Sequence, residues 1–150
     1  MDAPFILAVE RHMLDLVNGA RAAARAAPLA FDEALANAAR AHAADMEARD
    51  YFSHSGLGGS SAIRRIVAAN FRLWGRWQTA ENLAWTTTAP HRWPSLIIVD
   101  RLHGNLMRSP LHRASVLNPN FGLVGIGFAA GDFQRRAAVF VVQVFARVGA

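Results

Sequence analysis

Apolar residues recur every three or four positions through the first half of the chain, a period that predicts amphipathic helices. The first apolar stripe covers residues 5–20, and the second covers residues 32 to about 49. A glycine-rich loop at 55–59 follows, and Ser60 or Ser61 is the expected N-cap of a short third helix. The N-terminal half is therefore predicted to be helical.

The pattern changes in the second half of the chain. Residues 80–85 alternate like a short strand, and Pro94 suits the first turn of a fourth helix that Pro110 should end. Beyond that helix, apolar residues alternate with glycines at 124–128, and residues 139–148 are rich in β-branched and aromatic side chains. These features predict two further strands.

The last two strands are expected to form a hairpin with its turn around Gly131 and Asp132. Helices precede this hairpin without strand–helix–strand alternation, so the fold class is predicted to be α+β, with helices packed on an antiparallel sheet. A chain of 150 residues suits one domain, residues 1–150. The predicted core residues are Leu35, Met46, Val99, Leu106, Val124, Ile126, Phe128, Val142 and Val144.

Composition narrows the function classes. The chain has no cysteine, which excludes disulfides, thiolate metal sites and a thiol nucleophile. No apolar run approaches the length of a bilayer span, and residues 1–9 lack the basic region of a signal peptide. The net charge is +5 and every basic residue is an arginine, a usage that a GC-rich genome also produces. These arginines are dispersed, so we predict no nucleic-acid partner.

Glu81 is the first candidate for chemistry. Strand alternation places its carboxylate on the same face as Leu83 and Trp85. A carboxylate on an apolar face costs several kcal/mol, in rough terms, unless it is paired or hydrogen-bonded. A solvated face or backbone amides would satisfy it, but a histidine partner or a metal is the favoured interpretation.

Two histidines lie where helical stretches end. His54 precedes the glycine-rich loop, and His112 follows Pro110. Imidazole is the commonest metal ligand in proteins. The chain has no short chelating pair of histidines, so any site must assemble from distant segments.

The other histidines and the serines are weaker candidates. His42 and His103 lie on apolar helix stripes and are expected in the core or at helix contacts, whereas His12 and His91 are expected to be exposed. The Ser60–Ser61 pair lacks the sequence context of a serine nucleophile.

Six segments, in order along nearly the whole chain, resemble the CAP superfamily of cysteine-rich secretory proteins, antigen 5 and plant pathogenesis-related proteins. The chain is similar to the short, disulfide-free bacterial branch. The segments are Ala41-His42-x-x-Asp45-Met46, Asp50-Tyr51-Phe52-Ser53-His54, Glu81-Asn82-Leu83-Ala84, Met107-x-Ser109-Pro110-x-His112-Arg113, Asn118-Pro119-x-Phe121 with Val124-Gly125-Ile126-Gly127, and Val142-Gln143-Val144-Phe145.

This resemblance implies an α-β-α sandwich with a central cavity. In some family members the cavity binds zinc or another divalent cation between histidines and acidic residues. Carried over by motif, the cavity lining here is His54, Glu81, Ser109 and His112, with His54 and His112 as metal ligands. Arg113 is expected to anchor the loop that holds His112.

The chain departs from the family pattern at three positions near this site. Leu106 replaces the usual tryptophan, Ser109 stands where many eukaryotic members carry a second glutamate, and Ala80 replaces the glycine before Glu81. Two histidines and one carboxylate would still make an open three-ligand site, with less charge and weaker affinity.

Three functions follow as hypotheses. The first is a non-enzymatic binding module, extracellular or periplasmic by family resemblance, for a small-molecule, lipid or protein ligand. The second is a metal-dependent, peptidase-like hydrolase in which His54 and His112 hold the metal and Glu81 is the base. The third is an envelope interaction protein whose arginines contact anionic surfaces.

Overall fold

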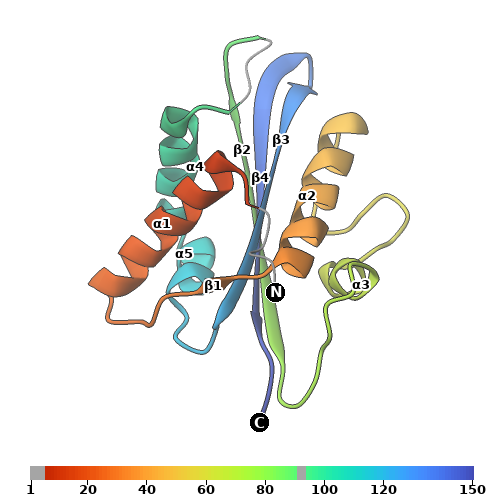
Figure 1. The fold of residues 1–150 in the computed structure, drawn as a ribbon. Helices are drawn as coiled ribbons and strands as arrows, with labels where there is room; N and C mark the ends of the chain where they lie inside the picture. The colour runs from red at the N-terminus through yellow and green to blue at the C-terminus, as the bar shows by residue number, and fades with distance from the viewer. Residues whose placement is uncertain (1–5, 91–93) are drawn as a thin grey trace.

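The computed structural model describes residues 6–90 and 94–150. A central sheet lies between two layers of helices (Figure 1). In chain order the elements are α1 (Ala8–Ala23), β1 (Ala30–Phe31), α2 (Glu33–Ala48), α3 (Ala62–Ala68), β2 (Gln78–Thr87), α4 (Leu96–Arg108), α5 (Pro110–Leu117), β3 (Leu123–Phe133) and β4 (Arg136–Arg147). The predicted α-β-α sandwich is confirmed. None of the helices in the described residues has the length and hydropathy of a membrane span.

The sheet has the order β1-β3-β4-β2, so the predicted hairpin forms its centre. Strands β2, β3 and β4 pair antiparallel, whereas the short β1 adds a parallel edge that the sequence analysis did not predict. The hairpin turn falls at Gln134 and Arg135, which adopt φ of 48° and 67°, so the predicted turn at Gly131–Asp132 is wrong. Gly131 instead lies within β3 beside the flexible Glu47 side chain, which would have to move to admit a Cβ there.

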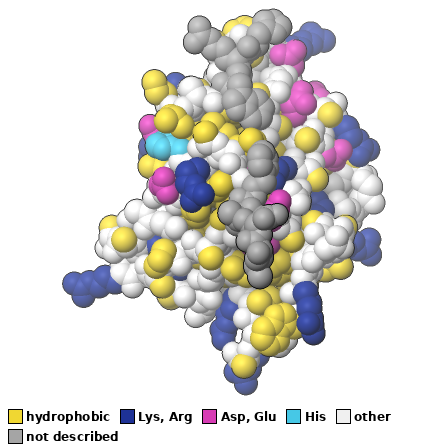
Figure 2. All heavy atoms as spheres, in the orientation of Figure 1, with side chains coloured by type: hydrophobic (Ala, Val, Ile, Leu, Met, Phe, Trp, Pro, Cys, Tyr) yellow, Lys and Arg dark blue, Asp and Glu magenta, His cyan; other side chains and the backbone are white. Residues whose placement is uncertain are grey.

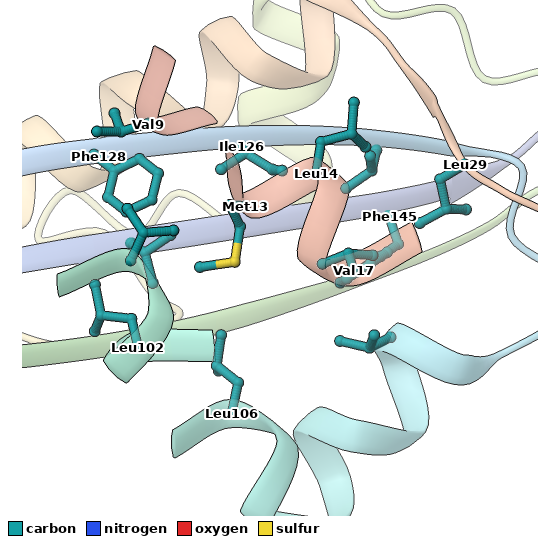
Figure 3. Close-up of a cluster of buried hydrophobic side chains, with 14 of the residues drawn as sticks. Val9, Met13, Leu14, Val17, Leu29, Leu102, Leu106, Ile126, Phe128 and Phe145 are labelled. Carbon is teal, nitrogen blue, oxygen red and sulfur yellow. The ribbon is translucent and has the colours of Figure 1, made fainter. Parts of the chain in front are cut away.

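Strand alternation divides the core into two layers. Val124, Ile126 and Phe128 face α1, α4 and α5, and Figure 3 shows part of this cluster around Met13 and Leu102. The opposite face of the sheet packs against α2 and α3. All nine predicted core residues are buried, with exposed fractions between 0% and 6%.

Glycines bring α2 unusually close to β3. A Cβ at Gly125 would lie 2.1 Å from the backbone of Leu35 and Ala36, and one at Gly127 would lie 2.2 Å from the amide of Arg40. The alternating glycines of this strand therefore let the helix backbone rest directly on the strand. The resulting contact fixes the position of α2, whose end carries the segment with His54.

The helix ends follow local capping chemistry. Ser61 caps α3 and Ser95 caps α4, each accepting a hydrogen bond from a backbone amide three residues later. The fourth helix therefore begins after Pro94, not at it. Pro110 does follow the end of α4, but it also opens the separate helix α5, because a proline at the first helical position needs no amide partner. The predicted first helical position, Phe5, lies outside the described residues.

A buried arginine joins α1 to the connection after α5. Arg21 is 0% exposed, and its guanidinium donates hydrogen bonds to four backbone carbonyl oxygens. These belong to Ala27 at 2.7 Å, Val116 at 2.8 Å, Asn118 at 2.9 Å and Phe121 at 3.1 Å. The cation thus caps carbonyls at the C-terminal end of α5, where the helix dipole also favours a positive charge.

Candidate functional site

The segment that follows α2 is held at two points before it reaches His54. The Tyr51 hydroxyl donates to the Asp45 carboxylate at 2.5 Å, and the ring of His42 donates from Nε2 to the Ser53 carbonyl at 2.8 Å. Burial and the Asp45 charge raise the pKa of Tyr51 to about 12, so it stays a donor. Burial lowers the pKa of His42, which favours its neutral form. His42 is 2% exposed, which confirms the predicted core position.

Glu81 lies on the α2–α3 side of β2 with Leu83, as strand alternation predicted. Its side chain is 4% exposed, and both carboxylate oxygens are hydrogen-bonded. His54 donates from Nδ1 to Oε1 at 2.8 Å, and Arg65 donates from Nη2 to Oε2 at 2.7 Å. The predicted histidine partner of Glu81 is therefore His54, and a second partner, Arg65, completes its pairing.

Arg65 also secures the glycine-rich loop. Its guanidinium donates to the carbonyl oxygens of His54, at 2.9 Å, and Ser60, at 3.0 Å. Because Arg65 belongs to α3, one side chain ties this helix, the loop before it and strand β2 together. Arg65 was not predicted from the sequence, where only its position next to Arg64 sets it apart.

His54 is oriented by its partner. A carboxylate can only accept a hydrogen bond, so Nδ1 carries the ring proton and the Nε2 lone pair remains for another partner. The His54 side chain is 62% exposed. A histidine fixed by a carboxylate on one nitrogen and open on the other has the arrangement of many metal-binding histidines.

His112 lies on α5 and is held through its backbone. The Asn82 side chain, 1% exposed, donates to the His112 carbonyl at 3.1 Å and to Gln143 Oε1 at 3.1 Å. Arg113, the predicted anchor of this loop, is exposed, and its side chain has no partner among the described residues. That prediction is wrong, because Asn82 does the anchoring from the buried face of the sheet.

The electrostatics connect the two histidines. Burial lowers the pKa of His112, and a positive charge on His54, when that ring is protonated, would lower it further. His112 is thus partly buried and electrostatically coupled to His54, although the two are distant in sequence. Whether both rings reach one ligand, and whether Ser109 lines the same space, stays a prediction. The Ser109 side chain makes no capping hydrogen bond to α5.

The predicted three-ligand metal site does not fit this geometry. No three histidine, aspartate or glutamate side chains are grouped to hold a metal ion anywhere in residues 6–90 and 94–150. Both Glu81 oxygens already accept a hydrogen bond, and the neighbouring Arg65 guanidinium balances the carboxylate charge. What the geometry does show is that Glu81 orients the His54 ring from Nδ1.

Two further features lie outside this group of residues. A hollow of about 390 Å³ opens between the end of β2, at Thr87 and Thr88, and the start of α4, at Ile98 and Arg101. None of the predicted site residues lines it.

His12, predicted to be exposed, is partly buried and contacts Asp100 of α4 at 2.6 Å, while His91 lies outside the described residues.

One protein-family model matches most of the chain. The model of the family described as "CAP: Cysteine-rich secretory protein family" matches residues 14–145. The "Uncharacterized protein YkwD" of Bacillus subtilis is 28% identical over 125 residues, which are 82% of this chain and 43% of that protein.

Two solved structures share the fold. An extracellular protein containing an SCP domain from Bacillus anthracis superposes with a TM-score of 0.72 at 23% identity, covering 97% of this chain and 45% of that one. An outer surface protein from Borrelia burgdorferi superposes with a TM-score of 0.68 at 19% identity, covering 98% of this chain and 100% of that one. The chain spans less than half the length of the two Bacillus proteins.

Proposed function

Because the chain belongs to the cysteine-rich secretory protein (CAP) family, we propose that it is an extracellular or periplasmic binding module that presents His54 and His112 to a ligand. The location rests on the similar structures, one described as extracellular and one as an outer surface protein. The ligand class we propose is a divalent cation such as zinc, together with the small molecule, lipid or protein that this cation would help to bind.

One observation carries the proposal: both oxygens of the buried Glu81 carboxylate are already hydrogen-bonded. Glu81 is therefore a positioning residue that keeps the Nε2 lone pair of His54 directed away from it. Two imidazoles are a sparse ligand set, so a bound cation would keep open positions for another molecule. This arrangement suits recognition of a ligand.

The same hydrogen bonds to Glu81 argue against the alternative function, a metal-dependent hydrolase with Glu81 as base. A general base must reach the proton that it removes, at about 2.6–3.2 Å or through one water. Glu81 is 4% exposed and is held between a guanidinium and an imidazole. Each of its oxygens already accepts a hydrogen bond from one of these cationic or proton-donating partners, which makes it a weaker base toward a water molecule.

Calorimetric zinc titration tests the proposal. His54→Ala and His112→Ala should each abolish measurable zinc binding, and His12→Gln, which changes a histidine on α1, should leave it intact. Glu81→Gln should weaken binding by about 10–100-fold, the usual effect of losing the group that orients a metal-binding histidine. Binding should weaken as pH falls, because protons compete for the imidazoles.

Two results would contradict this assignment. Zinc affinity unchanged in both histidine variants would remove the site. Reproducible zinc-dependent hydrolysis of peptides or esters, lost in Glu81→Gln, would make the protein an enzyme instead.

A further inference from the structure

We propose that one end of the molecule docks onto an anionic phospholipid surface. The docking residues are those of the loop that enters β2, here called the tryptophan–arginine loop (72–78), together with Arg147 at the end of β4. The inference stands apart from the histidine site, since it uses none of those residues.

Two indole rings of this loop are exposed to solvent. Trp74 is 50% exposed and Trp77 is 45% exposed. An aromatic side chain carries a large apolar surface, and neighbouring ones left uncovered mark a site of interaction. The described part of the chain leaves about half of each ring without cover.

The loop backbone is fixed, so the exposure of the rings is built into the fold. The Gly149 amide donates to the Trp74 carbonyl at 3.1 Å, and the Arg76 amide donates to the Gly149 carbonyl at 2.7 Å. Gly75 adopts φ of 65°, and a Cβ there would lie 2.1 Å from the Gly149 oxygen. These contacts hold the loop backbone at Trp74 and Arg76 in place before any partner arrives.

Every charged side chain of the tryptophan–arginine loop is positive. Arg72 and Arg76 are exposed and Arg147 is partly buried, and none of them has an ion pair among the described residues. The sequence has no acidic residue between Asp50 and Glu81. Figure 2 shows apolar side chains flanked by basic ones at the lower end of the molecule, where Figure 1 places this loop and the C-terminal end.

Tryptophan beside arginine is the chemistry of a lipid interface. Indole rings favour the headgroup level of a bilayer, and each arginine near an anionic membrane adds to the attraction. The loop lies at the extreme end of the molecule, so a flat surface can meet it without obstruction (Figure 1). Single-stranded nucleic acid would instead require a groove along which bases stack.

Sedimentation with lipid vesicles tests the proposal. The protein should bind vesicles of equal parts phosphatidylcholine and phosphatidylglycerol, and should not bind phosphatidylcholine alone. Each of Arg72→Gln and Arg76→Gln should weaken binding about fivefold. The double variant Trp74→Ala/Trp77→Ala should weaken vesicle binding at least about tenfold. The exposed half of each indole ring, roughly, would no longer be transferred from water into the lipid interface.

Matched variants at the other end of the molecule serve as controls. Arg135→Gln/Arg136→Gln, at the β3–β4 turn, removes two exposed positive charges, one more than each loop variant, and Leu96→Ala/Ile97→Ala removes exposed apolar surface of α4. Both should bind the mixed vesicles like the unchanged protein. Tryptophan emission should shift to shorter wavelength on the mixed vesicles, and the shift should shrink in the double tryptophan variant.

Three outcomes would overturn the proposal. The first is no binding to the anionic vesicles, and the second is equal loss in the control and loop variants. The third is a tighter association with single-stranded DNA that depends on the same residues. His54→Ala/His112→Ala should bind vesicles normally, so failure of the histidine site and failure of this surface are told apart.

Discussion

Replacing Arg65 by methionine should destabilise the protein by about 3 kcal/mol, at the lower end of the 3–5 kcal/mol cost of removing one partner from a buried ion pair. Methionine keeps an unbranched apolar side chain of similar length but loses the guanidinium. The side chains of Arg65 and Glu81 are 11% and 4% exposed, so water cannot fully replace the lost partner. The variant also loses the hydrogen bonds to the carbonyls of His54 and Ser60. His54 still donates to Glu81, which keeps the expected cost near the lower bound.

Urea denaturation followed by circular dichroism at neutral pH measures this cost. Arg64→Met is the matched control on the same helix, because Arg64 is exposed, and it should change the free energy of unfolding by no more than about 0.5 kcal/mol. Adding Glu81→Leu to Arg65→Met should restore part of the lost stability, since the carboxylate that has lost its guanidinium partner is then gone. A loss below about 1 kcal/mol in Arg65→Met, or purely additive losses in the double variant, would refute the argument.

Two other expectations concern the core and the response to acid. Ile126→Ala, at a residue 0% exposed, should cost about 2–5 kcal/mol in urea denaturation, whereas Leu111→Ala, at 83% exposure, should cost almost nothing. Equal effects would mean that strand β3 does not face the α1–α4 layer. Burial lowers the folded-state pKa of His42 and His103, so below about pH 6.5 the unfolded chain binds more protons. The contribution of these two neutral histidines to the free energy of unfolding should therefore be fully present above that pH. It should fall as the pH drops toward the folded-state pKa values. The buried Nδ1 of His103 has no hydrogen-bond partner, so His103→Leu should flatten this dependence, and an unchanged slope of urea midpoint against pH would contradict the assignment.

The sequence predicted those parts of the fold that depend on periodic burial. Helical spacing located α2 and α4, and alternation with glycine located β3 between two layers. The turn at Gln134 and Arg135 was missed because positive φ there is adopted by residues that give no glycine signal. Helix α5 was missed because the same proline that follows one helix can open the next.

In the candidate site, too, the local sequence pattern predicted one residue and missed two others. Glu81 was identifiable because a carboxylate on an apolar strand face requires a partner, and that partner is His54. Arg65 and Asn82 were not identified, because their roles depend on distances between elements that no local pattern encodes. Arg65 reaches Glu81 of strand β2 from helix α3, and Asn82 reaches His112 from the opposite face of β2.

The buried guanidinium of Arg21 affects how this protein responds to a change of pH and to substitution at this position. All four of its acceptors are neutral carbonyl oxygens, which neither gain nor lose a proton across the range where the histidines titrate. The junction between α1 and the segment leading to β3 is therefore indifferent to acidity. Lysine could not replace Arg21, because one ammonium nitrogen cannot occupy the three separate nitrogen positions from which those bonds are made. At this position the geometry of the guanidinium requires arginine in place of lysine. A GC-rich genome can account for arginine elsewhere in the chain, but it is not needed to explain Arg21.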